Sequence, residues 1–402
     1  MCESERAPLV VGRIAPPGSV ITAAARRLHS TSRAMRTLHP ELPPIPSRAD
    51  AVGEHLAGGG QVAAVLPVHY PRSLLRAFDL LPVEVWGPPV RDTQLGDAHL
   101  QAYTCSVVRS GLAVALAGGI DVASVLVVPH TCDSLQGLAS LLLDLVPARQ
   151  AVVPLYHPRV GGPAGTYFLA AELRAVYTRL ADVTGRHPDD AALSAAIARE
   201  EAADARLAAL LARQGSLPLG DRAFYTLARS REYLPAERFT PLADAALALP
   251  DAPADPAQVP IVLSGMFPEP MALFDAIAAA GGRVVGDDTA CVGRRAYPAG
   301  RSDDPFVRMA ERLVDGPPDS TRGSAVAVRL ARLRGLVAAR GVRAVLFLEV
   351  KFCEPELFYL PLLRAGLEAD GVRSTTIEVD VTEALPHQAI TRLEALLETV
   401  AP

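Results

Sequence analysis

Cysteine is scarce in this sequence, with 5 among 402 residues. So odd and sparse a set is not expected to form the disulfide framework of a secreted domain, which is cysteine-dense. The N-terminus, residues 1–6, also lacks the basic-then-apolar order of a signal peptide. We therefore expect a cytoplasmic protein whose thiols are free to act as nucleophiles or metal ligands.

An excess of basic charge and a long apolar run are missing as well. The net charge is −5 and the pI is near 6.0, so the sequence predicts neither nucleic-acid binding nor attraction to an anionic membrane. The most apolar stretch, residues 112–128, is broken by Gly118, Gly119 and Asp121 and is too short to span a bilayer. Small ligands and protein partners remain the expected binding partners.

The common phosphate and metal motifs are absent or misplaced. Residues 58–60 are glycines that precede a strand, whereas a dinucleotide-binding loop follows one. Residues 161–166 open a helix without the lysine of a P-loop, so a flexible helix start is the favoured interpretation. The sequence contains no His-Glu-x-x-His, Gly-x-Ser-x-Gly or CxxC motif, and its 9 histidines are scattered. A histidine zinc site therefore has little support.

What is present is an α/β pattern, interrupted once. Apolar strands without alternation, separated by helices, indicate a parallel sheet covered on both faces. Residues 163–246 differ, because Ala, Leu, Arg and Glu recur there at helical spacing. We therefore predict an α/β fold with two Rossmann-like parallel-sheet domains and an intervening helical domain. The predicted strands are 61–68, 83–85, 124–128, 261–263, 284–286, 344–350 and 374–379.

The expected domain limits follow from these changes of pattern. Residues 1–59 are Arg-, Pro- and Ser-rich and predict a partly irregular arm with one helix near 20–38. The first α/β domain is expected over 60–160, the helical domain over 161–250 and the second α/β domain over 256–402.

Three of the cysteines occupy equivalent positions. Cys132 and Cys353 each lie just past a predicted strand and before a helix, and Cys105 lies at a predicted helix start. Open α/β sheets bind ligands at the carboxyl ends of their strands, and a helix N-terminus stabilises a thiolate. A single buried cysteine is usually a small core residue. Three at such corners favour a shared site, although separations of 27 and 221 positions match no local cluster or zinc signature.

The residues around these cysteines resemble motifs of a known family. Residues 129–134 (PHTCDS) and 352–355 (FCEP) are similar to motifs of the 2-hydroxyacyl-CoA dehydratase family, which includes the benzoyl-CoA reductase cluster subunits. Cys105 with 109–110 (RS), 284–288 (VVGDD) with 293–294 (GR), and 391–395 (TRLEA) are further matches. The resemblance runs from about residue 60 to the end of the chain, and the two α/β domains around a helical one agree with it.

The resemblance implies a [4Fe–4S] cluster held by the thiolates of Cys105, Cys132 and Cys353. It leaves the fourth iron for water or for the thioester carbonyl of an acyl-CoA substrate. The implied reaction is a one-electron reduction of the thioester to a ketyl radical, which leads to dehydration. A separate ATP-dependent activator protein is implied as the electron donor, and a related family subunit in a heterodimer, or a second copy in a homodimer, as the partner.

Several alternatives stay open. The chain could be a ring-reductase subunit of the benzoyl-CoA type, a non-catalytic partner subunit, or a reductase with a double-cubane cluster. Where the family often has Pro-x-Glu-Leu and a later glycine, this chain has Ser73 and Asp79.

Six further residues have two interpretations or a minor role. Cys291 is a fourth ligand or a packed loop thiol, the latter being favoured. The acid pair 287–288 lines a site or forms a strand-end turn, the favoured role. Arginines 294 and 295 contact CoA phosphates or lie solvated on the surface, which is the default. Cys2 is treated as a tail residue.

Overall fold

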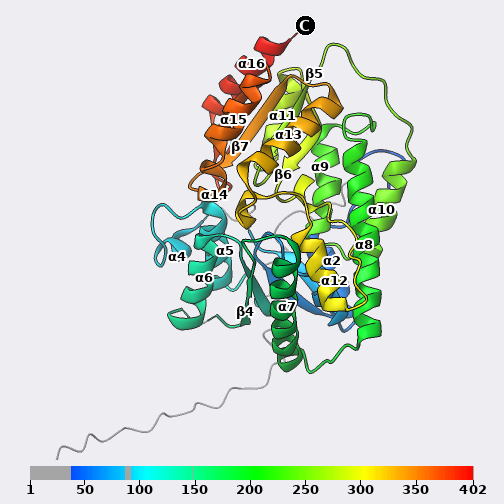
Figure 1. Ribbon diagram of the computed structural model, residues 1–402, viewed down its shortest axis with the longest axis vertical. Coiled ribbons are helices and arrows are strands. Elements are labelled where there is room, and N and C mark those ends of the chain that lie inside the picture. The colour runs from blue at the N-terminus through cyan, green and yellow to red at the C-terminus, as the bar shows by residue number, and fades with distance from the viewer. Residues whose placement is uncertain (1–37, 87–91, 147, 402) are drawn as a thin grey trace, which may run out of the picture.

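The computed structural model describes residues 38–86, 92–146 and 148–401. Two four-stranded parallel sheets form its framework, with strand orders β2-β1-β3-β4 and β6-β5-β7-β8. This confirms the prediction of two Rossmann-like α/β units. In Figure 1 the second sheet lies above the first, and helices of the intervening segment run beside both. The described helices include none with the length and apolar character of a membrane span.

The first sheet consists of β1 (Gln61–Val65), β2 (Leu80–Glu84), β3 (Ala123–His130) and β4 (Ala151–Tyr156). Its inner strands are apolar on both faces, as the sequence pattern requires. We did not predict β4, whose sequence contains Pro154. A proline lacks the backbone N–H that a central strand needs, but it is tolerated here because β4 is an edge strand.

Helices cover this sheet on both sides. They are α3 (Arg72–Ala77), α4 (Gln94–Asp97), α5 (Ser106–Leu116) and α6 (Asp133–Asp144). A further helix, α2 (Arg48–Ala57), lies in the segment that we expected to be an irregular arm. Its start is fixed by a capping box between Ser47 and Asp50, and it packs on β1. The helix expected at residues 20–38 lies, apart from Leu38, outside the described residues.

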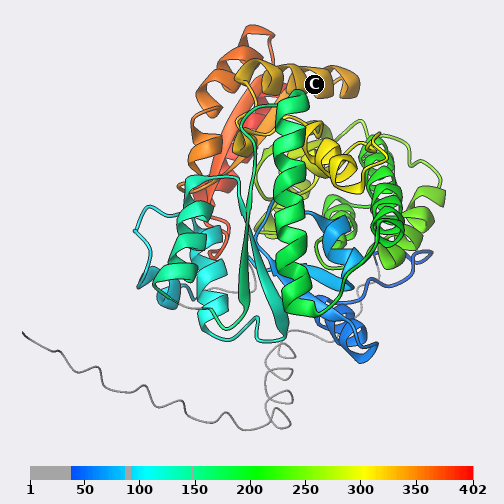
Figure 2. The same ribbon diagram turned by 60° about the horizontal axis from the view of Figure 1, so that its bottom comes forward.

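The intervening segment is helical throughout. It comprises α7 (Gly162–Thr184), α8 (Asp190–Ala212), α9 (Asp221–Arg229), the short 3₁₀ turn η1 (Ser230–Glu232) and α10 (Ala236–Ala248). Helix α7 lies along the first sheet against β4, as Figure 2 shows, while α8 packs on α3 and α10. Asp189 caps α8 by accepting a hydrogen bond from the N–H of Ala192 at 2.8 Å.

The second sheet repeats the arrangement of the first. Its strands are β5 (Val259–Gly265), β6 (Gly282–Thr289), β7 (Ala344–Val350) and β8 (Arg373–Val379). Its longer helices are α11 (Ala272–Ala279), α13 (Val326–Arg340), α15 (Leu360–Ala369) and α16 (His387–Val400), whereas α12 (Pro305–Val314) packs on α7 and α8. The short pieces η2 (Gly293–Arg295), η3 (Ser320–Arg322) and α14 (Glu354–Leu357) lie near the carboxyl ends of its strands.

Both sheets reverse their strand order at the same place. The chain runs outward from β1 to β2 and then returns to β3 on the other side, and β5, β6 and β7 do likewise. The carboxyl end of such a reversal is where open α/β sheets bind ligands. The segments that follow β3 and β7 are therefore the first places to look for a functional site.

Candidate functional site

Three cysteines sit at the N-caps of three helices. Cys105 precedes α5, Cys132 precedes α6 directly after β3, and Cys353 precedes α14 directly after β7. The first two come from the first sheet and the third comes from the second. The helix starts that the sequence predicted at these positions are confirmed.

The structure brings these three thiols together, and we call them the thiol site. Burial, the largest cause, and the nearby Cys105 thiol together raise the pKa of Cys132 to about 12. Burial also raises the pKa of Cys353, and Cys105 and Cys132 contribute to that shift. Each thiol is therefore close enough to feel charge on another.

Backbone groups at the helix starts oppose this effect. The N–H groups of residues 107 and 108 face the sulfur of Cys105, and those of residues 134 and 135 face that of Cys132; each pair lowers the pKa of its thiol. Such donors stabilise a thiolate. The thiol site thus provides backbone N–H donors that stabilise buried thiolates.

Contacts between the two sheets hold Cys105 against the second one. Ser106, the next residue, accepts a hydrogen bond at its hydroxyl from the N–H of Val381, just past β8, at 3.1 Å. One turn along α5, Arg109 lies 4.0 Å from the carboxylate of Asp380. These contacts place the start of α5 at the carboxyl edge of the second sheet, where Cys353 lies.

Thiols of this kind bind either a single metal ion or a cluster. Within the described ranges no group of three or more His, Cys, Asp or Glu side chains is arranged to hold one metal ion. An iron–sulfur cluster differs, because its thiolates bind separate iron atoms and so stand further apart than ligands of one ion. Three neighbouring thiols, two of them buried and one partly exposed, with backbone donors at Cys105 and Cys132, fit such a cluster.

Cys291 is not part of this group. It lies in the loop after β6, where burial raises the pKa of its thiol, and the charges that act on it come from Glu232, Arg229, Arg295 and Glu84. None of the other described cysteines is among these neighbours. This placement agrees with a packed loop thiol. Cys2 lies outside the described residues.

The acid pair near the end of β6 does not line the thiol site. Asp287 accepts hydrogen bonds from the N–H and the hydroxyl of Thr289 and from the N–H of Gly293, which is turn chemistry. Asp288 accepts from Arg329 at 2.7 Å and from Arg332 at 2.9 Å. Both carboxylates therefore stabilise the local fold.

Our expectation for Arg294 and Arg295 was wrong in both of its forms. Arg294 is fully buried and Arg295 nearly so, hence neither is a solvated surface residue or free for CoA phosphates. Arg294 pairs with Asp319 and Glu356, and Arg295 pairs with Glu84. Carboxylates distant in the sequence neutralise these charges, and no local pattern predicts such partners.

The departure that we noted at residues 73 and 79 has a structural counterpart. Ser73 is buried, and its hydroxyl accepts a hydrogen bond from Arg312 at 3.1 Å. Asp79 lies at the end of α3 with a positive φ of 56° and pairs with Arg186 at 2.9 Å. Neither of these contacts involves a cysteine of the thiol site.

Two kinds of buried polar residue near the thiols escaped the sequence reasoning. One is Glu349 on β7, where burial and the nearby Glu356 and Glu378 raise the carboxyl pKa to about 9. The other is a row of histidines, His69, His130 and His157, at the carboxyl ends of the first sheet. For His69 and His130 the available signal was their position just after predicted strands, which we used for cysteines only. His157 follows β4, which we did not predict, and Glu349 lies within a strand, so neither carried that signal.

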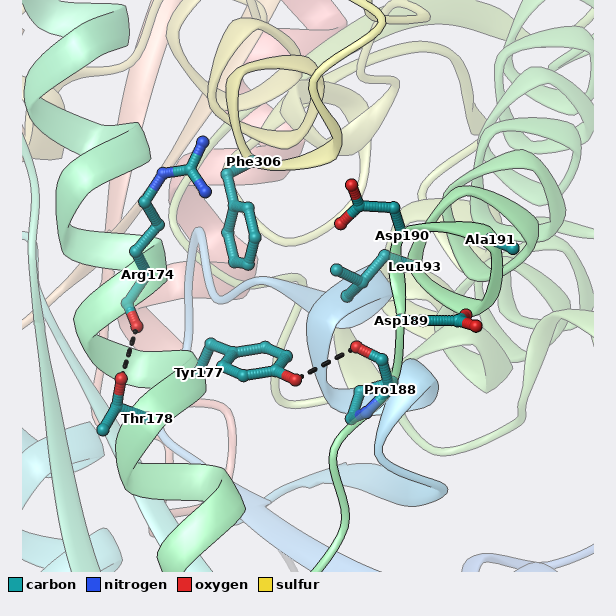
Figure 3. Close-up of a pocket in the computed structure, with 9 residues that line it drawn as sticks. All are labelled: Arg174, Tyr177, Thr178, Pro188, Asp189, Asp190, Ala191, Leu193 and Phe306. Atoms are coloured by element: carbon teal, nitrogen blue, oxygen red, sulfur yellow. Dashed lines mark hydrogen bonds between the residues drawn. The ribbon is translucent and has the colours of Figure 1, made fainter.

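An open hollow of about 670 Å³ lies elsewhere on the surface, between α7, α12 and the start of α8 (Figure 3). There the hydroxyl of Tyr177 donates to the carbonyl of Pro188 at 3.1 Å, and Arg174 lies over the ring of Phe306. None of the residues that line it is a cysteine or a histidine. The hollow therefore offers no reactive group comparable with the thiol site.

Comparison with known proteins gives a consistent result. The family model described as 2-hydroxyglutaryl-CoA dehydratase, D-component, matches residues 67–400. The beta subunit of lactoyl-CoA dehydratase from Anaerotignum propionicum is 26% identical over 363 residues, which cover 87% of this chain and 94% of the relative. The beta subunit of (R)-phenyllactyl-CoA dehydratase from Clostridium sporogenes is 24% identical, with 86% and 94% covered. One of the subunits of benzoyl-CoA reductase from Thauera aromatica is 29% identical over 142 residues, 34% of this chain and 36% of the relative.

Proposed function

Because this chain belongs to the 2-hydroxyglutaryl-CoA dehydratase D-component family, we propose that it is the iron–sulfur subunit of an enzyme that dehydrates a 2-hydroxyacyl-CoA. In this proposal Cys105, Cys132 and Cys353 hold a [4Fe–4S] cluster. The observation that carries it is the meeting of three thiols, each at a helix N-cap, from two different sheets.

The chain's own residues have three tasks in this proposal. The thiols of the thiol site anchor the cluster, and the N–H groups at the starts of α5 and α6 stabilise their charge. The burial of Cys105 and Cys353 keeps water from the sulfurs. When bound, the cluster would supply a single electron to the thioester of an acyl-CoA, a ketyl-type reduction that leads to loss of the hydroxyl group.

The proposal includes partners. Since two relatives that match over most of their length are named beta subunits, we propose that this chain works beside a related family subunit. An electron of low potential needs a donor, for which a separate ATP-dependent activator is proposed. The described cysteines are free thiols, and this is consistent with a reducing cytoplasm.

The names of these relatives, which are beta subunits, also favour a second candidate function. A protein of this kind could hold its cluster without contacting substrate, as a partner of the catalytic chain. The shorter match to a benzoyl-CoA reductase protein also keeps ring reduction within the chemistry that this family carries out. Turnover with a 2-hydroxyacyl-CoA or an aromatic acyl-CoA, with each subunit supplied in turn, separates these functions.

The test compares cysteine variants prepared without oxygen. Wild-type protein should contain about four iron and four sulfide per chain and give the electron paramagnetic resonance signal of a reduced cluster. Cys132→Ser and Cys353→Ser should lose most of that iron, since among the described residues no other thiol lies nearby to replace them. Cys291→Ser is the matched control, a buried cysteine outside the thiol site, and should keep its iron.

Two results would contradict the proposal. One is a colourless wild-type protein that takes up no iron on anaerobic reconstitution. The other is loss of iron in Cys291→Ser equal to that in Cys132→Ser, because the ligand set would then differ from the thiol site.

A further inference from the structure

Three histidines lie side by side at the carboxyl edge of the first sheet. His69 follows β1, His130 ends β3 and His157 follows β4, and these strands are neighbours. Their exposed fractions are 2%, 9% and 9%. We call them the histidine row. His130 lies two positions before Cys132, so the row runs along the same sheet edge as the thiol site.

The histidine row is short of hydrogen-bond partners. The Nε2 atoms of His69 and His157 and both ring nitrogens of His130 are buried without one. Buried polar atoms in proteins are almost always paired, and unpaired ones mark a ligand, a water or a functional role. Because Nε2 of His69 faces a carboxylate oxygen of Asp319, the three remaining atoms, on His130 and His157, are the ones that indicate a place for an oxygen-bearing ligand.

The inner ring, His69, is held by residues from the second half of the chain. The hydroxyl of Tyr297 lies 2.7 Å from its Nδ1, and a carboxylate oxygen of Asp319 lies 3.7 Å from its Nε2. The carboxylate favours a proton on Nε2, so Nδ1 accepts the hydrogen bond from Tyr297. Burial lowers the pKa of His69 to about 4, hence the ring is neutral near pH 7.

The middle ring, His157, has the opposite arrangement of donor and acceptor. Its ring lies 5.9 Å from that of His69 and bonds the backbone of His69. That bond raises the pKa of His157, which means that the ring donates to the carbonyl oxygen of His69. Burial outweighs it and keeps the imidazole neutral. Its unpaired Nε2 is therefore a lone pair that accepts a hydrogen bond.

The outer ring, His130, connects the histidine row to the surface. It packs edge-on against Tyr156 at a ring distance of 4.3 Å, and 45% of Tyr156 is exposed. Tyr156 is therefore the exposed neighbour of the histidine row, on the same sheet edge as the loop that carries Cys132. The lone pair on Nε2 of His157 is buried, so it selects a ligand that donates a hydrogen bond from a hydroxyl group.

We propose that the histidine row binds the hydroxyl-bearing acyl part of a 2-hydroxyacyl thioester, with Nε2 of His157 accepting the hydrogen bond of the 2-hydroxyl group. This inference rests on the proposed function, which it deepens by naming the residues that distinguish a hydroxylated acyl group from a deoxygenated one.

The test measures binding of lactoyl-CoA and of propionyl-CoA, which differ only in the 2-hydroxyl group. Calorimetric titrations are made on anaerobically reconstituted full-length protein, with any partner chain that co-purifies and without activator or ATP, so that no turnover occurs. Wild-type protein should bind lactoyl-CoA about three- to tenfold more tightly than propionyl-CoA, as expected for one hydrogen bond. His157→Leu should abolish this preference, and His157→Gln, which keeps an acceptor oxygen, should retain part of it.

The ratio of the two affinities is an internal control, because a folding defect weakens binding of both ligands alike. His187→Leu, at an exposed position in the loop before α8, should leave the ratio unchanged. The inference is overturned if wild-type protein binds the two thioesters equally or binds neither, or if His157→Leu keeps the preference.

Iron and sulfide are counted in the same samples. A protein without a cluster refutes the proposed function, whereas a loaded protein without hydroxyl preference refutes this inference alone.

Discussion

The guanidinium of Arg294 is a fully buried charge whose removal should destabilise the protein strongly. It donates to Asp319 and to Glu356, each at 2.8 Å, and to the backbone carbonyls of Gly265 and Asp288 at 2.6 and 2.8 Å. These groups belong to β5, β6, α14 and the residue that caps η3. The change to test is Arg294→Met, which keeps much of the volume of the side chain and removes its charge and every donor.

The expected loss of stability follows from the two carboxylates that stay buried when Arg294 is removed. Without Arg294 the carboxylate of Asp319 keeps Thr321 as a partner and that of Glu356 keeps Ser320, but neither retains a cation within 3.5 Å. Breaking a buried pair by removing one partner costs about 3–5 kcal/mol, since an uncompensated charge stays buried. Burial alone would raise the pKa of Asp319, and the attraction of Arg294 is the largest effect that holds it well below its usual range. Glu356→Gln in the Arg294→Met background should therefore recover about 1–2 kcal/mol.

The assay is urea unfolding followed by far-ultraviolet circular dichroism, with the shift in midpoint converted through a common slope. Arg301→Met is the matched control, because Arg301 pairs with Asp315 at 2.7 Å but its side chain is 70% exposed. It should change the free energy of unfolding far less than Arg294→Met does, because solvent screens an exposed pair. If Arg294→Met unfolds at the same urea concentration as Arg301→Met, burial does not determine the strength of these pairs and the reasoning is refuted.

Two further changes test local features. Burial raises the pKa of Asp221 from 3.8 to about 6, so this carboxyl stabilises the fold fully below pH 3.8 and that stabilisation is lost as the pH rises through 6. The difference amounts to about 3 kcal/mol. Urea midpoints measured from pH 4 to 7 should therefore fall with rising pH in the wild type but not in Asp221→Asn, whose side chain still accepts the hydrogen bond from the N–H of Val284. A pH dependence that persists in the variant would belong to another group. Gly265 has a φ of 140°, and an added Cβ would lie 2.1 Å from the carbonyl oxygen of Leu348, whereas a Cβ on Gly341 meets nothing within 4 Å. Gly265→Ala should thus lower the thermal midpoint far more than Gly341→Ala, where the left-handed φ of 60° costs an alanine about 1 kcal/mol. Equal effects would contradict the close approach.

The sequence predicted the framework because its signals are local. Apolar runs bounded by helix starts indicated strands such as β3 and β7, and both were found close to their expected limits. The same pattern placed each cysteine of the thiol site at a strand-to-helix corner. β4 and α2 escaped prediction, because a proline in one and a proline-rich approach to the other obscured the period.

The buried charges could not be predicted in the same way. Arg295 and its partner Glu84 are separated by 211 positions, and Arg294 and Glu356 by 62. An arginine that is neutralised by a distant carboxylate looks, in one sequence, like a solvated surface residue. Only the fold decides which of the two it is, and our default was therefore wrong at both arginines.

These long-range polar contacts also explain how a site can be shared by two sheets. Cys132 and Cys353 belong to different sheets, so their separation depends on how firmly one sheet is fixed to the other. Apolar packing is non-directional and would allow small slips between the two units. Hydrogen bonds are directional, and those that cross the boundary near the sheet edges include Arg295 to Glu84, Tyr297 with His69, and Val381 to Ser106. The buried polar groups therefore fix the relative position of the thiols, and their cost in desolvation is consistent with a requirement for geometry over stability.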